Sequence, residues 1–352
     1  MANMSILKRI LIKNTIKAIV GVIIFKYLRV RYGKNIFIFI TRGKTGDIYL
    51  YFRFLENFIK KKNIDKYIFI GDCKNLEQIK TLYPNIKGDY IKTSERIGSA
   101  LQITYCLLSN YDKNIALNLM WDVDLPYNRC AVRLTKKFNF VESYYWFLFD
   151  LDDENCVPAE AIFNKLDKNL ENKLKLLGVE KNKTVILSPY AYCVRNLDPL
   201  FWIVLGKDLE NRGYKIFVML DPKSEKNLFG YPTIFFKYAD TKAILEYAGN
   251  FIALRSGFCD IMSSSECNKV ILYPTVPKKF DGSVHRSDIK YSSLQIMRLT
   301  NNVTEITVPF ARDIVNFEAE NENFEERINE FIMLKKEILN RFAIISLGVS
   351  KC

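Results

Sequence analysis

The chain has 352 residues, of which 49% are hydrophobic, and a net charge of +13. This length allows one large domain or two of ordinary size, and the hydrophobic content is ample for packed cores. The eight cysteines show no CxxC spacing, so reduced thiols are expected. A single histidine excludes a His-rich metal site. His285, in the loop-like stretch Asp281–Arg286, is therefore the one histidine that could act as the base for a serine or cysteine nucleophile.

The positive charge is concentrated at the N-terminal end. Residues 1–62 hold 14 Lys or Arg and two acidic residues, whereas the rest of the chain is nearly balanced. Within Ser5–Val30 apolar residues recur at helical spacing, but the unbroken apolar run Ala18–Phe25 is far shorter than the roughly 20 residues that span a bilayer. The pattern predicts either a helix on an anionic membrane surface or an amphipathic helix docked on the protein. On the first interpretation, removal of residues 1–30 should leave a folded, soluble body.

Strands and helices alternate from residue 35 onward. The predicted strands are Asn35–Thr41, Lys66–Ile70, Asp89–Lys92, Asn114–Trp121 and Tyr144–Phe149. The predicted helices open at Asp47 and cover Asn75–Tyr83, Arg96–Ser109 and Leu125–Lys137. Such an alternation is typical of a parallel sheet that is covered by helices on both faces.

A second alternation follows a long helical pattern over Pro158–Leu177. Its predicted strands are Thr184–Ser188, Lys215–Leu220, Thr233–Tyr238, Phe251–Leu254 and Lys269–Tyr273, and its predicted helices are Asp198–Asn211, Thr241–Gly249 and Phe258–Cys267. A charged helical pattern covers Phe317–Phe342. We therefore expect a basic N-terminal segment (1–34), two α/β domains (35–155 and 156–310) linked near residues 155–182, and a C-terminal helical segment (311–352).

Three polar stretches each follow a predicted strand, at the end where ligands of doubly wound sheets bind. They are Thr41–Asp47 (TRGKTGD), Ser188–Trp202 (SPYAYCVRNLDPLFW) and Arg255–Asp260 (RSGFCD). A Ser-Gly turn at a helix start presents free backbone N–H groups, which suits a phosphate and also an ordinary βαβ turn. Asp47 can likewise be a simple helix cap.

These stretches resemble those of family 9 glycosyltransferases, the lipopolysaccharide heptosyltransferases. Ile38–Thr41 followed by Gly46 and Asp47 is similar to the family's N-terminal signature. Arg195 falls where the family has a phosphate-binding lysine, Trp202 falls on a family tryptophan, and Ser256-Gly257 falls on its Ser/Thr-Gly turn.

Two positions of the third stretch depart from the family pattern, and Tyr51-Phe52-Arg53 stands where the family usually has a proline after the first motif. Arg255 stands where the family has an acidic residue, and Asp260 stands where it has a histidine. The resemblance therefore favours glycosyl transfer as a class over heptose transfer, and it suggests a different donor.

The resemblance implies an α/β fold of the GT-B type. Two Rossmann-like domains would face each other across a cleft, with the acceptor on the first and the sugar nucleotide on the second, and a C-terminal helix can return to the N-terminal domain. Asp47 would be the general base of an inverting displacement. The leaving diphosphate would be held by Arg195, Arg255, Ser256 and Gly257, with Ser188 and Tyr190 in the donor-domain loop. No metal and no cofactor beyond the nucleotide-sugar co-substrate is implied.

The expected function is transfer of a sugar from a nucleotide-sugar donor to a cell-surface polysaccharide or lipid-linked glycan, as in lipopolysaccharide or capsule synthesis. The protein would be cytoplasmic and peripheral on the inner face of the membrane through its N-terminal helix, with no nucleic-acid partner. Two alternatives remain open. Asp122 and Asp124, in an Asp-x-Asp motif after a predicted strand, could hold a metal in a metal-dependent glycosyltransferase. The chain could also be a non-catalytic, membrane-associated scaffold of polysaccharide assembly.

Overall fold

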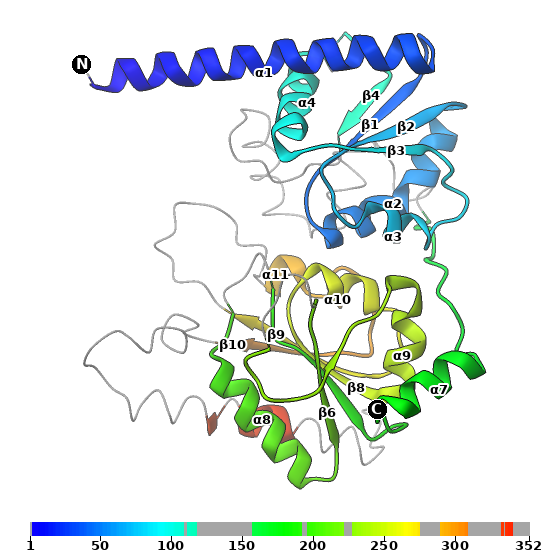
Figure 1. The fold of residues 1–352 in the computed structure, drawn as a ribbon, viewed down its shortest axis with the longest axis vertical. Helices are drawn as coiled ribbons and strands as arrows, with labels where there is room; N and C mark the ends of the chain where they lie inside the picture. The colour runs from blue at the N-terminus through cyan, green and yellow to red at the C-terminus, as the bar shows by residue number, and fades with distance from the viewer. Residues whose placement is uncertain are drawn as a thin grey trace. The chain divides into compact units, whose positions relative to one another are not determined.

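A computed structural model describes residues 2–108, 111–117, 157–191, 196–221, 227–274, 289–308, 332–333 and 335–340. The chain divides into two compact units. Unit 1 comprises Met1–Leu134 and Val141–Ile162, and unit 2 comprises Thr135–Phe140 and Phe163–Cys352. Each unit contains a parallel sheet with helices, so the predicted α/β class with two domains is confirmed (Figure 1). The predicted elements at Leu125–Lys137 and Tyr144–Phe149 lie outside the described residues.

The sheet of unit 1 has the strand order β3-β2-β1-β4, with every pair parallel. Its strands are β1 (Phe37–Thr41), β2 (Tyr67–Gly71), β3 (Asp89–Lys92) and β4 (Ile115–Leu117). The helices of this unit are α1 (Ala2–Tyr32), α2 (Thr45–Lys61), α3 (Leu76–Lys80) and α4 (Glu95–Leu108). Each predicted strand and helix that falls on described residues of this unit is present.

Alternating side chains decide which helix covers which face of this sheet. In β1, Phe37 and Phe39 point to one face and Ile38 and Ile40 to the other, because successive residues of a strand face opposite sides. The phenylalanines meet aromatic rings of α2, with 5.9 Å between the ring centroids of Phe37 and Phe58. The isoleucines join a core cluster that contains Leu101 of α4.

The C-terminal half of α1 is docked on α4. Phe25 and Leu28 are buried in the same core cluster as the isoleucines of β1. The two helices approach closely at Gly21, where a Cβ atom would come within 2.0 Å of the Thr104 hydroxyl oxygen. That hydroxyl donates a hydrogen bond of 3.1 Å to the carbonyl of Ala18. Deletion of residues 1–30 would remove Phe25 and Leu28 from this core and expose α4. The expectation that the rest of the protein stays folded without these residues is therefore corrected.

The sheet of unit 2 has the strand order β10-β9-β8-β5-β6-β7 and is also parallel. Its strands are β5 (Thr184–Ser188), β6 (Lys215–Met219), β7 (Thr233–Ile234), β8 (Gly249–Leu254), β9 (Asn268–Pro274) and β10 (Thr304–Val308). The last of these was missed in the sequence, although TEITV has the β-branched character of a strand.

The helices of unit 2 are α7 (Lys168–Leu176), α8 (Pro199–Asn211), α9 (Thr241–Ala248), α10 (Gly257–Met262) and α11 (Ile289–Ser292), with a 3₁₀ turn η2 (Tyr238–Asp240). The apolar side of α8 packs on the sheet in a core cluster that also contains Ile338 and Leu339. Lys335 forms a 2.7 Å ion pair with Asp208 of α8. The described part of the C-terminal helical segment thus packs within unit 2.

The helical pattern over Pro158–Leu177 becomes a helix only at Lys168. Asp167 caps this helix by accepting a 2.7 Å hydrogen bond from the Leu170 N–H. The residues before it bond elsewhere, because the Ala159 and Ile162 N–H groups donate to the carbonyls of Arg53 and Leu82. These long-range bonds replace the ones that a helix would make within itself.

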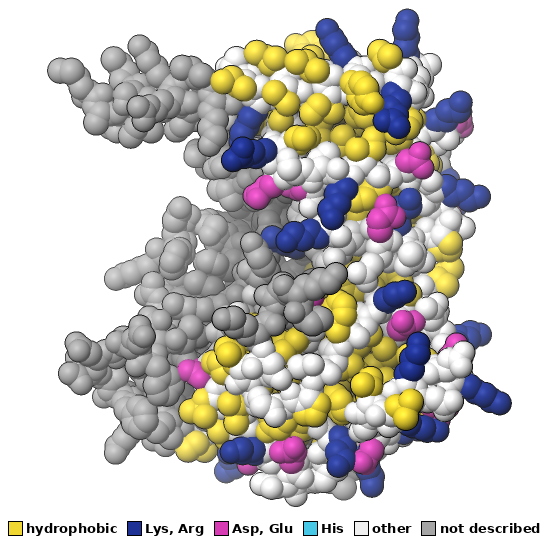
Figure 2. Space-filling model, viewed as in Figure 1, with side chains coloured by type: hydrophobic (Ala, Val, Ile, Leu, Met, Phe, Trp, Pro, Cys, Tyr) yellow, Lys and Arg dark blue, Asp and Glu magenta, His cyan; other side chains and the backbone are white. Residues whose placement is uncertain are grey.

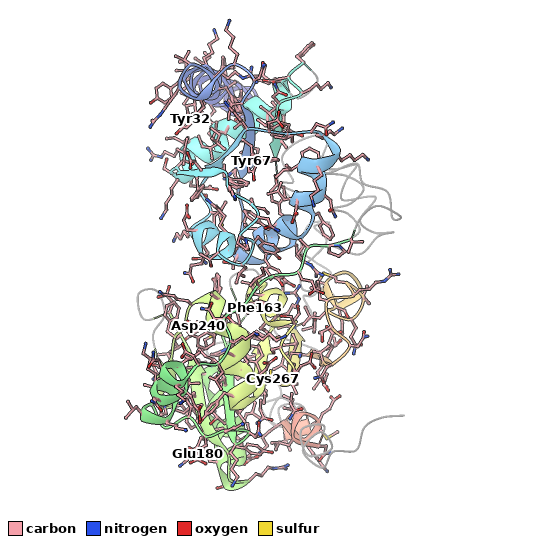
Figure 3. All side chains as sticks on the ribbon, turned by 90° about the vertical axis from the view of Figure 1, so that its right-hand side faces the viewer. Tyr32, Tyr67, Phe163, Glu180, Asp240 and Cys267 are labelled. Atoms are coloured by element: carbon pink, nitrogen blue, oxygen red, sulfur yellow. The ribbon has the colours of Figure 1, made fainter. Side chains whose placement is uncertain are left out.

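The long segment of unit 2, Phe163–Cys352, begins near Asp240 (Figure 3). The neighbouring Asn164 donates its backbone N–H to the Ala239 carbonyl and its side-chain amide, at 2.7 Å, to the Asp240 carboxylate. The division between units after Ile162 falls inside the range 155–182 that the sequence suggested for the link.

Candidate functional site

The strand order of each sheet creates a topological switch point. In unit 1 the chain runs from β1 to β2 and β3 on one side and later adds β4 on the other side of β1. In unit 2, β6 and β7 lie on one side of β5, and β8 to β10 follow on the other. Ligands of open α/β sheets bind outside the carboxyl ends of the strands at such points. The three polar stretches follow β1, β5 and β8, which are three of the four strands that flank the two switch points.

Two of the predicted stretches are brought together in unit 2. The parallel register pairs Ser188 of β5 with Ala253 of β8, so the end of β5 lies beside the turn that begins at Arg255. Ser188 is 3% exposed, and Tyr190 packs its ring 5.5 Å from that of Phe229. Ser188, Tyr190 and the Arg255–Gly257 turn therefore share one edge of the sheet. Arg195 lies outside the described residues.

The chain on either side of residues 192–195 is firmly positioned. The Ala191 N–H donates to the Asn196 side-chain oxygen at 2.9 Å. Asp198 caps α8 by accepting from the Leu200 N–H at 2.7 Å, and Pro199 occupies the first helical position, which suits its fixed φ angle. Trp202, which matches the family's tryptophan, is fully buried in the core under α8, and its role here is packing.

The Ser256-Gly257 turn starts a helix that is shorter than predicted. Ser256 is the N-cap of α10, in extended conformation, and its carbonyl accepts from the Cys259 N–H at 3.0 Å. The helix ends at Met262 and does not reach Cys267, because the Ser263 hydroxyl competes for the helix backbone by donating a 2.7 Å hydrogen bond to the Asp260 carbonyl. A helix of six residues has a small dipole, so its first N–H groups are what this turn offers a ligand.

Arg255 is buried and braces this turn from behind. Its Nε donates to the Ser292 carbonyl at 2.9 Å, one terminal nitrogen lies 2.6 Å from the Asp260 carboxylate, and the other bonds to the Ser256 carbonyl. Burial by itself would lower the pKa of the guanidinium, but the Asp260 carboxylate outweighs it and the pKa lies above its usual value. Arg255 and Asp260, which both depart from the family pattern, thus form an internal ion pair that positions the turn.

A second buried network lies next to Arg255. The Glu305 carboxylate of β10 accepts a 2.7 Å hydrogen bond from the Leu294 N–H and further bonds from the Tyr273 and Ser293 hydroxyls. Burial raises the pKa of the Tyr273 hydroxyl well above its usual value, so this hydroxyl stays protonated and donates. Through these bonds, Glu305 anchors the segment around α11, whose Ser292 carbonyl receives Arg255. Sequence reasoning missed this residue together with its strand.

Asp47 is the third residue of α2, whose first residue is Thr45. It is therefore not the residue that opens the helix. Its carboxylate accepts a 3.1 Å hydrogen bond from the Lys44 N–H. Gly43, at a φ of +101°, allows this close turn, since a Cβ there would lie 3.0 Å from the same carboxylate oxygen. Asp47 thus closes the helix start at the carboxyl end of β1, and its role as a base remains a prediction.

Arg42, Asp72 and Gln102 form a polar cluster at the same edge of the unit 1 sheet. Two nitrogens of Arg42 lie 3.3 and 3.2 Å from one oxygen of Asp72, and the third bonds to the Gln102 side chain. The register places Asp72 there, because β1 and β2 end as the pair Thr41–Gly71. The sequence offered one signal, an acidic residue directly after a buried strand. Beside this cluster, burial raises the pKa of the Cys73 thiol to about 11.

Among the described residues, no group of three or more His, Cys, Asp or Glu side chains is placed to hold a metal ion. Asp122 and Asp124, the proposed metal ligands, lie outside those residues. No helix in the described part of the chain combines the length and apolar character needed to cross a bilayer.

No protein-family profile matches the sequence, and no curated protein matches it. The structure is similar to several glycosyltransferase structures. It is similar to a family 9 glycosyltransferase from Veillonella parvula, at 12% identity and a TM-score of 0.47 over 86% of this chain and 97% of that one. It is similar to the ADP-heptose LPS heptosyltransferase II of E. coli, at 10% identity and a TM-score of 0.49 over 77% and 89% of the two chains.

A third similar structure is E. coli heptosyltransferase WaaC with ADP, at 12% identity and a TM-score of 0.45 over 85% of this chain and 99% of that one. At these identities the likeness concerns the arrangement of the chain. The roles of individual residues are therefore argued from their own geometry.

Proposed function

We propose that this protein is a glycosyltransferase that moves a sugar from a nucleotide-sugar donor to a glycan acceptor. The observation that carries the proposal is the pairing of Ser188 with Ala253, which sets two of the predicted stretches side by side at the switch point of the unit 2 sheet. Nucleotides bind at this place in doubly wound folds. The resemblance of these stretches to the donor-domain motifs of family 9 glycosyltransferases supports the same assignment.

The proposed reaction is an inverting displacement that needs no metal. An acceptor hydroxyl attacks the anomeric carbon of the donor sugar, the bond to the nucleoside diphosphate breaks, and the hydroxyl proton passes to Asp47. The negative charge on the leaving diphosphate is met by Arg195 and by the N–H groups of Ser256 and Gly257. Arg255 acts through the turn that it braces.

For the acceptor we propose a cell-surface polysaccharide or a lipid-linked glycan, glycosylated at the inner face of the membrane. The basic N-terminal end supports this location, because seven Lys or Arg and no acidic residue lie on α1. Whether the sugar is a hexose or a heptose depends on donor contacts near the turn at which Arg255 and Asp260 depart from the family pattern.

The deciding experiment is a thermal-shift screen against UDP-, GDP-, CMP-, dTDP- and ADP-sugars. A ligand that binds only the folded state stabilises it by about 2.7 kcal/mol at 100 times its Kd, so one nucleotide class should raise the Tm measurably. Release of the matching nucleoside diphosphate with a glycan acceptor then tests turnover. If no sugar nucleotide shifts the Tm or binds in calorimetry, the enzyme proposal fails and a scaffold role takes its place.

A further inference from the structure

Helix α1 is apolar on two opposite sides. One side carries Phe25 and Leu28 into the core of unit 1. The other side is exposed, with Ile23 at 60% and Val30 at 88% of their full accessible surface. We call this second side the outer face of α1; it consists of Ile16, Ile19, Val20, Ile23, Tyr27 and Val30.

The outer face is one continuous stripe. Its members are three or four residues apart, so on an α-helix they lie within a sector of about 100°. Lys26 and Arg31, both exposed, fall on the two edges of that sector. Arg31 also bonds to the Tyr27 hydroxyl at 3.1 Å, which holds its charge beside the stripe. Hydrophobic side chains lie over α1 together with Lys and Arg in Figure 2.

An apolar stripe with cationic edges fits one kind of surface. The apolar side chains of an interfacial helix enter the boundary between head groups and acyl chains, while Lys and Arg reach anionic head groups through their aliphatic stems. A second copy of the same face fits poorly, because α1 carries cations and no acidic residue and two copies would bring like charges together.

We propose that the outer face of α1 docks on the anionic leaflet of a lipid bilayer, with the helix lying in the plane of the interface. Unit 1 would be attached through the inner face of α1, the side that carries Phe25 and Leu28. The inference stands on α1 alone and does not depend on sugar transfer. The phosphate of an anionic phospholipid is the chemical group that the edge cations recognise, and the acyl boundary receives the stripe.

The test is co-sedimentation of the full-length protein with vesicles of phosphatidylcholine alone and of phosphatidylcholine with phosphatidylglycerol, at about 0.1 M salt. We expect binding to the anionic vesicles only. The double variant Lys26→Glu/Arg31→Glu should lower the apparent affinity more than tenfold, since each cation near an anionic surface contributes roughly fivefold. Ile19→Ser/Ile23→Ser should also abolish most binding.

A matched control uses exposed leucines outside α1. Leu176→Ser/Leu177→Ser removes two exposed apolar side chains at the end of α7 and should bind anionic vesicles like wild type. Because the altered side chains on α1 are exposed, all variants should keep the wild-type circular dichroism and Tm.

A Trp in place of Tyr27 reports insertion directly. Brominated phospholipids should quench the added fluorescence of Tyr27→Trp on anionic vesicles, and wild type should show no such component. Equal binding to neutral vesicles, binding unchanged by the Glu variants, or no binding at all would each overturn the proposal. So would a dimer, seen by light scattering, that Ile19→Ser/Ile23→Ser dissolves without any vesicle binding in wild type.

Discussion

Asp47 can combine two roles because its carboxylate sits at a helix start and at a strand end at once. As the third residue of α2 it accepts the Lys44 N–H, and an acidic side chain there is also favoured by the helix dipole. The same position at the carboxyl end of β1 is where an acceptor hydroxyl would arrive in the proposed reaction. The two roles can be separated, since capping needs an oxygen atom and base catalysis needs the charge.

We predict that Asp47→Asn keeps the fold and loses turnover. The amide oxygen can still accept the Lys44 N–H, so the loss of stability should be about 0.3–1 kcal/mol from the dipole alone. General-base catalysis contributes typically 10²–10⁴-fold, and kcat should fall by that range while donor affinity stays close to wild type. Steady-state kinetics and calorimetry measure the two effects. Near-normal turnover in this variant would remove Asp47 from the mechanism.

Gly257 offers a way to delete one backbone N–H without breaking the helix. It is the first residue of α10, where proline is tolerated, and the preceding Ser256 is already extended, as a residue before proline prefers. We predict that Gly257→Pro weakens donor binding by roughly tenfold, the effect of losing one charge-assisted hydrogen bond of 1.5–3 kcal/mol. Gly257→Ala, which retains the N–H, is the matched control. Equal donor affinities in the two variants would show that this N–H does not hold the diphosphate.

The buried Lys269 of β9 should make stability depend on pH. It is 1% exposed, its ammonium group bonds to the Ser265 carbonyl, and burial lowers its pKa despite the opposing effects of Cys267 and Glu266. Because the unfolded chain binds this proton up to about pH 10.4, the unfavourable contribution is full at low pH and fades as pH rises above the folded-state pKa.

We therefore predict that Lys269→Met raises the Tm most near pH 7, and that the gain shrinks toward about pH 10. Melting curves across this range measure it. Lys207→Met, at an exposed position of α8, is the control and should show a difference from wild type that does not change with pH. A pH-independent gain for Lys269→Met would mean that the lysine keeps an ordinary pKa in the fold.

At the scale of elements, the docking of α1 depends on small residues at its crossing with α4. Gly21 leaves no room for a side chain, because an added Cβ would also lie 2.8 Å from the Ala100 carbonyl. Thr104 then ties the two helices by donating to the Ala18 carbonyl. The inner face of α1 is thus part of the unit 1 core, and only the outer face is available for a partner.

We predict that Gly21→Leu destabilises unit 1 by about 1–3 kcal/mol or more, since the added atoms must push α1 from α4. Urea unfolding measures this loss, and the rate of proteolysis within α1 should rise with it. Ile16→Leu, on the exposed outer face, should leave both measurements unchanged. Wild-type stability in Gly21→Leu would contradict the docked arrangement.

The elements themselves were largely predictable because each depends on local pattern. In β1 and β2 the alternation of aromatic residues and isoleucine indicated strands that are buried on both sides. The failures occurred where distant backbone groups or neighbouring hydroxyl side chains compete for the hydrogen bonds of a helix. Residues 158–167 have a helical pattern but bond to the carbonyls of Arg53, Leu82 and Ala239, and α10 stops early at a run of serines.

For the whole molecule, the proposed chemistry predicts independence from divalent metals. Arg195 and backbone N–H groups would meet the diphosphate charge, so turnover should persist in EDTA at the wild-type rate. Nucleoside diphosphate release with and without EDTA measures it. Loss of turnover that manganese restores would instead favour Asp122 and Asp124 as metal ligands, and Asp122→Asn would then abolish the metal response.

The sequence alone determined two parallel α/β sheets and the placement of three polar stretches after β1, β5 and β8, because hydrophobic period and turn residues are local properties of a chain. Only the tertiary structure decided which strands are neighbours. It set Ser188 beside the Arg255 turn, placed Asp72, which follows β2, beside Arg42, which follows β1, and paired Arg255 with Asp260 inside the protein. It also divided the apolar surface of α1 into a buried and an exposed face. The hydrophobic periodicity of the sequence could not predict which face is buried, because both faces are apolar. These outcomes depend on hydrogen bonds and packing between segments far apart in the chain. Such contacts stabilise the protein only after the segments have been brought together in the fold, so no local pattern predicts them.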